Sequence, residues 1–117
     1  MNQWVGVHPK ELCRQHLLGL HGELHKFLPS WKKQTRIDGR IADNQMECGL
    51  YKQRHDEIAA EMVSRGFNHK SPLDQPDFSY LPLEHQNFRV RTDGAMSNRC
   101  KLATRCPECA RRMQNKS

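Results

Sequence analysis

The sequence lacks any long apolar run, and this absence limits the classes of protein that it can encode. Hydrophobic residues make up 36% and aromatic residues only 7% of its 117 positions. Because a helix that spans a bilayer needs about 20 consecutive apolar residues, no membrane segment is expected. The opening residues MNQWVGVHPK also lack the basic head and apolar stretch of a signal peptide. These absences predict an intracellular protein with a modest core.

The alternation of apolar and polar residues that marks a half-buried strand is missing as well. The sequence instead predicts an all-α fold, a compact single domain over residues 1–117 with about three helices and long ordered loops. The helices are expected at residues 9–28, 44–65 and 96–105. Loops are expected at residues 32–43 and, because of three prolines, at residues 70–83.

Local signals set the ends of these helices. Pro9 suits a first helical position, and Pro29 is expected to end the first helix. Asn44 and Glu47 have the spacing of a capping box at the start of the second helix, and Gly66 follows its predicted end. The third helix is expected after a turn at residues 93–94, with an apolar side that carries Met96, Cys100 and Ala103.

The positive charge is concentrated in the last third of the chain. Residues 1–84 contain 11 basic and 11 acidic side chains, whereas residues 85–117 contain 8 basic ones against Asp93 and Glu108, so the surplus of +6 lies there. A second basic cluster is formed by Lys32, Lys33, Arg36 and Arg40. Two such patches favour a polyanionic partner, most often nucleic acid. A solvated basic face explains them equally well.

The first predicted helix separates apolar from polar residues. A helix rotates by about 100° per residue. With that period, the apolar residues of this helix form one stripe: Cys13, Leu17, Leu20, Leu24, Phe27 and Leu28. A polar group lies together on one flank of that stripe and consists of Gln15, His16, Gly19, Gly22, Glu23 and Lys26. Each glycine costs roughly 1 kcal/mol in a helix interior relative to alanine. Two on one face suggest that a ligand approaches the backbone closely, and a solvated face with two tolerated glycines is the alternative.

His55 is a polar residue inside an apolar stripe. On the second predicted helix that stripe is otherwise formed by Tyr51, Ile58 and Met62. A histidine in such a place is most often a core residue whose nitrogens have partners. The other expectation is that it faces the first helix near His16 and Glu23.

Two sets of residues raise the alternative of a metal site. His21 and His25 are four residues apart, a spacing at which two imidazoles can share a zinc ion, but no carboxylate lies beside them. Cys106-Pro-Glu-Cys109 has half of a zinc-knuckle pattern, which the fold would have to complete. The candidates for completing it are Cys100, Cys13 and His85. The preferred interpretation has no metal site, and the five cysteines are thiols because disulfides are rare inside cells.

Two segments then point to a family. KELCRQHLLGLHGELHKF and, some thirty residues later, RHDEIAAEMVSRGFNHKSPL resemble the phage-type pyrimidine-dimer DNA glycosylases, the phage endonuclease V family, in order, spacing and content. They cover about a third of the chain, and the RCPEC tail is similar to one found in a shorter bacterial and phage subgroup. The resemblance implies a compact helical protein without metal or other cofactor. It implies a monomer that acts on double-stranded DNA with UV lesions or abasic sites, in the cytoplasm of a bacterial or phage-infected host cell.

The resemblance also implies a chemistry and a set of residues. Such enzymes remove a base at a cyclobutane pyrimidine dimer and then cleave the strand by β-elimination as an AP lyase. The nucleophile is the chain's α-amine, which here belongs to Met1, or to Asn2 if Met1 is removed, and the essential glutamate matches Glu23. The DNA-binding positions match Gln3, Gln15, His16, Gly22, Lys26, Arg54, His55 and Lys70. The alternative function is a non-catalytic nucleic-acid-binding module with a Cys-based zinc site in the C-terminal tail.

The implied chemistry fits the residue types. An α-amine has a reference pKa near 8, so an appreciable fraction is neutral and able to form an imine at physiological pH. A carboxylate beside it can stabilise a cationic sugar and later move a proton. Such enzymes also kink DNA and extrude a nucleotide, at a cost of a few kcal/mol that is lower at a damaged site. Gly22 and Lys26 stand where the family has arginines, so the lesion preference is left open.

Overall fold

The structure is a computed structural model that describes residues 1–69 and 71–114. These residues form helices and loops without a strand, which confirms the predicted all-α class. The prediction of about three helices is wrong in number, because the described chain has seven α-helices and two 3-10 helices. In order they are η1 (Pro9–Glu11), α1 (Arg14–Lys26), α2 (Leu28–Lys32), α3 (Asp38–Ala42), η2 (Cys48–Leu50), α4 (Tyr51–Ser64), α5 (Leu83–Gln86), α6 (Thr92–Arg105) and α7 (Pro107–Gln114).

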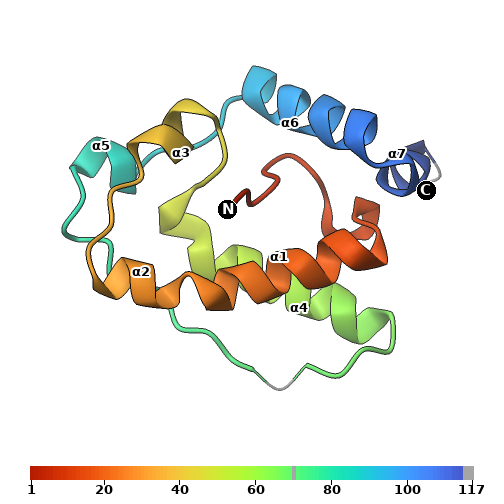
Figure 1. Ribbon diagram of the computed structural model, residues 1–117, viewed down its shortest axis with the longest axis horizontal. Coiled ribbons are helices and arrows are strands. Elements are labelled where there is room, and N and C mark those ends of the chain that lie inside the picture. The colour runs from red at the N-terminus through yellow and green to blue at the C-terminus, as the bar shows by residue number, and fades with distance from the viewer. Residues whose placement is uncertain (70, 115–117) are drawn as a thin grey trace.

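Two pairs of helices give the molecule its shape. Figure 1 shows α1 running along α4, while α6 and α7 form a second group on the other side of the chain's first residues. The short helices α2, α3 and α5 close one end of the molecule. The start of the chain therefore lies between the two groups, close to α1.

The first predicted helix begins later than expected. Pro9 belongs to η1, whose first residue is preceded by His8 in a capping box with Glu11. The backbone is extended at Leu12 and Cys13, and α1 starts after Cys13, whose sulfur accepts a hydrogen bond from the backbone N–H of His16. Pro29 does not end a helix but lies in the first turn of α2, where its missing N–H costs nothing.

The second predicted helix is shorter than its sequence signals indicate. Asn44 has a left-handed φ of 56° and does not cap a helix, while the Glu47 carboxylate accepts from the backbone N–H of Val90. As a result α4 begins at Tyr51, and the predicted loop before it contains α3. The predicted end is confirmed, since α4 stops at Ser64 and Gly66 follows with a φ of 87°.

The third predicted helix is present but turns a different face inward. Residues 93–94 lie in the first turn of α6 rather than in a separate turn. Met96 is 61% exposed and Cys100 is also exposed, whereas the buried residues are Gly94, Asn98 and Leu102. The reason is that this face contacts the start of the chain, where a small residue and an amide are needed. Helix α7 had no counterpart among the predicted elements.

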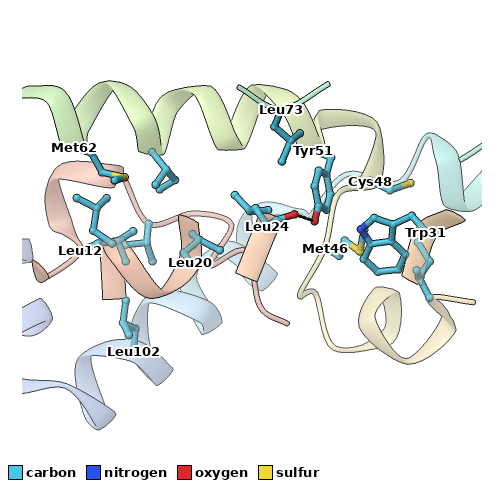
Figure 2. Close-up of a cluster of buried hydrophobic side chains, with 14 of the residues drawn as sticks. Leu12, Leu20, Leu24, Trp31, Met46, Cys48, Tyr51, Met62, Leu73 and Leu102 are labelled. Carbon is cyan, nitrogen blue, oxygen red and sulfur yellow. Dashed lines mark hydrogen bonds between the residues drawn. The ribbon is translucent and has the colours of Figure 1, made fainter. Parts of the chain in front are cut away.

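The core confirms the apolar stripes predicted for the first two helices. Figure 2 shows the buried side chains of Leu20 (α1), Met62 (α4) and Leu102 (α6) gathered around Leu12, which precedes α1. Full burial of one such side chain contributes on the order of 1.5–3 kcal/mol. Toward α2, the Tyr51 hydroxyl donates to the backbone carbonyl of Leu24, the hydrogen bond drawn in Figure 2. Burial raises the pKa of Tyr51 to about 12, which keeps the hydroxyl protonated as a donor.

No helix within the described residues is both long enough and apolar enough to cross a membrane.

Candidate active site

One flank of α1 faces solvent along its length, and we call it the open flank. It consists of Gln15, His16, Gly19, Gly22, Glu23 and Lys26, all exposed except the half-buried His16. A Cβ built on Gly19 or Gly22 would meet no atom within 4 Å. The helix backbone is therefore open to a molecule that lies against this flank.

A pocket of about 240 Å³ lies between the open flank and the first residues of the chain. It is lined by Asn2, Trp4, Gln15, His16, Gly19, Leu20 and Glu23. The indole ring of Trp4 meets the His16 imidazole edge-on, with ring centroids 6.5 Å apart. The pocket thus brings the start of the chain to the same place as three of the polar residues predicted from α1.

The α-amine of Met1 lies within electrostatic reach of Glu23 and Arg40. Burial and then the positive charge of Arg40 lower the pKa of this amine below its usual 8.0, while Glu23 acts in the opposite direction. A lower pKa leaves more of the amine neutral at physiological pH, and only the neutral form is nucleophilic. The Arg40 guanidinium lies over the rings of Phe27 and Trp31, 5.5 and 5.7 Å from their centroids.

Residues 1–7, which we call the N-terminal segment, are held by hydrogen bonds from α4 and from the chain before it. Gln3 is only 1% exposed; its backbone N–H donates to the carbonyl of Gln45 (2.8 Å), and its side-chain oxygen accepts from the N–H of Glu47 (3.0 Å). Arg54 donates from Nε and Nη2 to three backbone carbonyls at 3.0 Å each. Those carbonyls belong to Gln3, Trp4 and Val7.

These contacts change the interpretation of two residues expected to bind DNA. The side chains of Gln3 and Arg54 point into the protein. The Gln3 side-chain oxygen accepts from the backbone of Glu47, and the Arg54 guanidinium donates to the N-terminal segment. A guanidinium that already serves three carbonyls has little capacity left for a phosphate. In this structure both residues position the N-terminal segment. Lys70, another residue expected to bind DNA, lies outside the described residues.

Helix α6 holds the same segment from the other side, a contact that was not predicted from the sequence. The Asn98 amide donates to the carbonyls of Val5 (3.0 Å) and Asn44 (2.9 Å). A Cβ on Gly6, which has a φ of 99°, would lie 2.6 Å from the Cβ of Ala95, so only glycine allows this approach. An asparagine within a helix and a glycine in a loop are common, and only their contact in space gives them this role.

The basic side chains divide into structural and exposed ones. Arg99 forms an ion pair with the buried Glu11, with Nη2 and Oε2 3.0 Å apart, and Arg112 donates to the carbonyl of Lys10 at 2.9 Å. Other basic residues of the two predicted patches have exposed side chains: Lys32, Lys33, Arg36, Arg89, Arg91, Lys101, Arg105 and Arg111. The exposed set can contact an extended polyanion without breaking the fold.

The other flank of α1 is closed by a group that we call the histidine cluster: His21, His25, His55 and His69. His55 is fully buried, with its Nε2 3.1 Å from Nε2 of His25 and its Nδ1 3.0 Å from a carboxylate oxygen of Asp56. The expectation that His55 lies near His16 and Glu23 is wrong, because α4 packs against the opposite flank of α1. Burial and the neighbouring histidines lower the pKa of His21 to about 4.

A fourth group gathers at the start of α1, and we call it the thiol–imidazole cluster. It consists of Cys13, His16, Cys106 and Cys109, whose ligand atoms all lie within 4.8 Å of one another. Cys13 directly precedes α1 and His16 lies in its first turn, while Cys106 directly precedes α7 and Cys109 lies in its first turn. Of the three candidates for completing the Cys106-Cys109 pair, the structure brings Cys13 to it, whereas His85 and the exposed Cys100 are not members of the cluster. Both clusters consist of residue types that bind transition metals.

Comparison with known protein families gives a match over most of the chain. The family model described as pyrimidine dimer DNA glycosylase matches residues 1–75 of the chain. This range contains the N-terminal segment, α1, α4 and the pocket residues between them. Searches among curated proteins and among solved structures found no match.

Proposed function

This chain belongs to the pyrimidine dimer DNA glycosylase family, and from that premise we propose that it is a glycosylase and AP lyase for UV-damaged double-stranded DNA. The proposed reaction removes a base at a cyclobutane pyrimidine dimer through an imine with the α-amine of the chain. Strand cleavage by β-elimination follows. The proposed nucleophile is the amine of Met1, or of Asn2 after removal of Met1.

One observation carries this proposal more than the others. The Met1 amine, with a pKa below its usual value, lies within electrostatic reach of the Glu23 carboxylate beside an open pocket. An imine-forming amine and a carboxylate are the two groups that this chemistry requires. Helix α1 carries Glu23, while Arg54 of α4 and Asn98 of α6 hold the N-terminal segment by hydrogen bonds to its backbone carbonyls.

The groups have separate roles in the proposed reaction. The neutral amine attacks C1′ of the damaged nucleotide and loses a proton, while the glycosidic bond breaks. The base keeps that electron pair, takes up a proton and stays joined to its neighbouring pyrimidine through the cyclobutane ring. The sugar ring opens to give the imine, with Glu23 stabilising the positive charge that develops at C1′. Glu23 then accepts a proton from C2′, the C3′–O bond breaks, and water hydrolyses the imine to free the amine.

The open flank suits the approach of a kinked DNA backbone. With space at Gly19 and Gly22, the backbone of α1 can be reached without a steric barrier. Gln15, His16 and Lys26 are proposed to contact DNA around the lesion from the same flank. The exposed lysines and arginines of the two basic patches would bind phosphates farther along the duplex, with the strong salt dependence of counterion release.

Borohydride trapping tests the proposed chemistry directly. The wild-type protein and Glu23→Gln are incubated with a duplex containing a thymine dimer and with one containing an abasic site, with chelator present in one set of samples. A covalent complex on both duplexes, mapped by peptide mass to the first residue, is the expected result. The Glu23→Gln protein should bind both duplexes but cleave them slowly.

The other outcomes are equally informative. Trapping on the abasic duplex alone would leave a lyase with lost or altered base specificity and would contradict the dimer assignment. No trapping on either duplex would overturn the imine mechanism. A complex mapped to a lysine side chain would move the nucleophile away from the N-terminal segment.

A further inference from the structure

The thiol–imidazole cluster has the ligand pattern of a metal site. Cys13 and His16 form a C-x2-H pair at the start of α1, and Cys106 and Cys109 form a C-x2-C pair at the start of α7. Two such pairs that face one another are the usual way in which short chain segments supply four ligands to zinc. The residues come from parts of the chain more than 90 positions apart, since Cys13 and Cys109 are separated by 96.

The distances between the ligand atoms fit one tetrahedral ion. Nδ1 of His16 lies 3.2 Å from the Cys13 sulfur and 3.5 Å from the Cys109 sulfur, and the sulfurs of Cys13 and Cys106 are 3.9 Å apart. With Zn–S near 2.3 Å and Zn–N near 2.0–2.1 Å, a tetrahedron has edges of about 3.5–3.8 Å. Disulfide sulfurs would lie about 2.0 Å apart, so these thiols are free and spaced for a shared cation.

Backbone N–H groups already point at the sulfurs. The N–H groups of His16 and Cys109 donate to the sulfurs of Cys13 and Cys106, each at 3.4 Å, and the N–H of Cys13 donates to the sulfur of Cys109 at 3.2 Å. Such bonds favour the thiolate form that binds a metal. Cys13 also caps the N-terminus of α1, which adds partial positive charge beside its sulfur. Cys106 lies where α6 ends and α7 begins, so the dipoles of those two helix ends oppose one another there.

We propose that Cys13, His16, Cys106 and Cys109 bind one structural zinc ion that joins α7 to the start of the active-site helix. Three thiolates and one neutral imidazole fill all four positions, so no position is left for catalysis. The bound Nδ1 fixes the proton of His16 on Nε2, which leaves a hydrogen-bond donor on a residue that lines the pocket. That last consequence rests on the proposed function, whereas the zinc site itself does not.

Cobalt substitution of the full-length protein tests this site. After removal of bound metal, Co²⁺ is titrated into the wild-type protein, and a sulfur-to-cobalt charge-transfer band that grows to saturation is expected. Cys106→Ser and Cys109→Ser should lose or weaken that band. Cys100→Ser, which changes an exposed thiol outside the cluster, is the matched control and should keep it. His16→Cys should strengthen the band, since it replaces the nitrogen ligand by a fourth sulfur.

Each outcome decides the proposal. Absence of the band from the wild-type protein, or its survival when Cys106 and Cys109 are both replaced, would overturn the site. Loss of the band in Cys100→Ser would mean that the ligands are wrongly assigned. Circular dichroism shows whether a serine variant has unfolded; in that case the wild-type titration and His16→Cys, which keeps four ligands, still decide.

An independent observation supports a second metal site, at the histidine cluster. Nε2 of His21 and Nε2 of His69 are buried and have no hydrogen-bond partner, although both lie beside the close Nε2 pair of His25 and His55. Buried polar nitrogens without partners are uncommon in folded proteins. Nδ1 of His55, the ring nitrogen that faces away from the cluster, lies beside the Asp56 carboxylate. His25 also makes a hydrogen bond with the backbone of Ser71. Outer partners of this kind orient metal-binding histidines.

The geometry points to a late first-row divalent metal ion, such as Zn²⁺, held by these four imidazoles. Zinc content and X-ray absorption of the full-length protein test it, because Zn–N and Zn–S distances of about 2.0–2.1 and 2.3 Å are distinguishable. The wild-type protein should bind two equivalents. The double variant His21→Gln/His69→Gln should lose the one with nitrogen ligands only, and His8→Gln, a control outside both clusters, should lose neither. If the wild-type protein contains only one zinc ion and that ion has sulfur ligands, the second site is overturned and the first is not.

Discussion

The two flanks of α1 carry similar residues and have opposite surroundings. The open flank has an imidazole, a carboxylate and two glycines facing solvent and the start of the chain. The other flank also has two imidazoles, yet these are enclosed by α4 and the segment around His69. A histidine on the open flank can therefore meet a substrate, whereas the histidines on the other flank meet other histidines of the protein and, as proposed above, a metal ion. What packs against a residue decides its role, and the residue type alone does not.

The largest expected effect comes from replacing Glu23, the carboxylate of the open flank. Glu23→Gln should reduce cleavage of a thymine-dimer duplex by about 100-fold or more, the range typical of a lost proton-transfer group. Because Glu23 is exposed, the fold should be unchanged. Single-turnover cleavage rates measure this effect, with Glu84→Gln as an exposed control on the distant helix α5. Equal rates for Glu23→Gln and wild type would remove Glu23 from the reaction.

The next effect tests whether the open flank needs a fixed N-terminal segment. Arg54→Met removes three hydrogen bonds to that segment, and it should lower the rate of borohydride trapping by tens of fold while DNA affinity changes little. The stability loss is expected at about 1.5–3 kcal/mol, as for hydrogen bonds to a charged group. Rates, fluorescence anisotropy and denaturant unfolding provide the three readouts.

Arg65→Met is the matched control for that experiment. Arg65 directly follows α4. Its side chain donates to the Glu61 carboxylate and to the carbonyls of Pro9, Lys10 and Leu12, which follow the N-terminal segment. Its loss should destabilise the protein to a similar extent and leave the trapping rate within a few fold of wild type. If the trapping rate falls by the same factor in both variants, Arg54 contributes stability only and does not position the amine.

The comparison of the flanks also shows what could be predicted from the sequence. The helical period gave the stripe of Leu17, Leu20 and Leu24 correctly, because a burial pattern over several turns depends on local spacing. The end of α4 at Gly66 was predicted for the same reason, since a left-handed residue after a helix is a local feature.

What could not be predicted depends on contacts between distant parts of the chain. Cys13 meets Cys109 across 96 positions, His25 meets His55 across 30, and Asn98 meets Val5 across 93. No spacing along the chain encodes such meetings. Asn44 shows the converse error, because its capping signal with Glu47 is local while the actual partners of both residues are distant.

A smaller effect concerns the pH dependence of the open flank. The positive charge of Arg40 is one cause of the lowered pKa of the Met1 amine. A lowered pKa means that the amine loses its proton at lower pH, so wild-type trapping on abasic DNA should reach half its maximum below pH 8.0. In Arg40→Gln the pKa should rise and the profile should move to higher pH. Trapping rates between about pH 6 and pH 9, which bracket the reference value of an α-amine, measure the shift.

The control for that profile is Arg36→Gln, which removes an exposed charge from the same basic patch. Its profile should coincide with that of the wild type, although its DNA affinity falls at low salt. A displaced profile in both variants would assign the shift to the general field of the patch. An unmoved profile in Arg40→Gln would remove Arg40 as a cause.

The smallest effect tests whether DNA binds against the open flank or whether that flank is exposed without binding DNA. Gly19→Ala and Gly22→Ala meet no steric conflict, so each should raise the free energy of unfolding by roughly 1 kcal/mol through higher helix propensity. If a DNA backbone lies against this flank, the added methyl groups should nevertheless weaken binding to lesion DNA by a few fold. Gly39→Ala in α3 has equally open surroundings and should leave DNA affinity unchanged. Tighter or equal binding in all three variants would place the DNA elsewhere, because a methyl group in the path of a phosphate cannot be neutral.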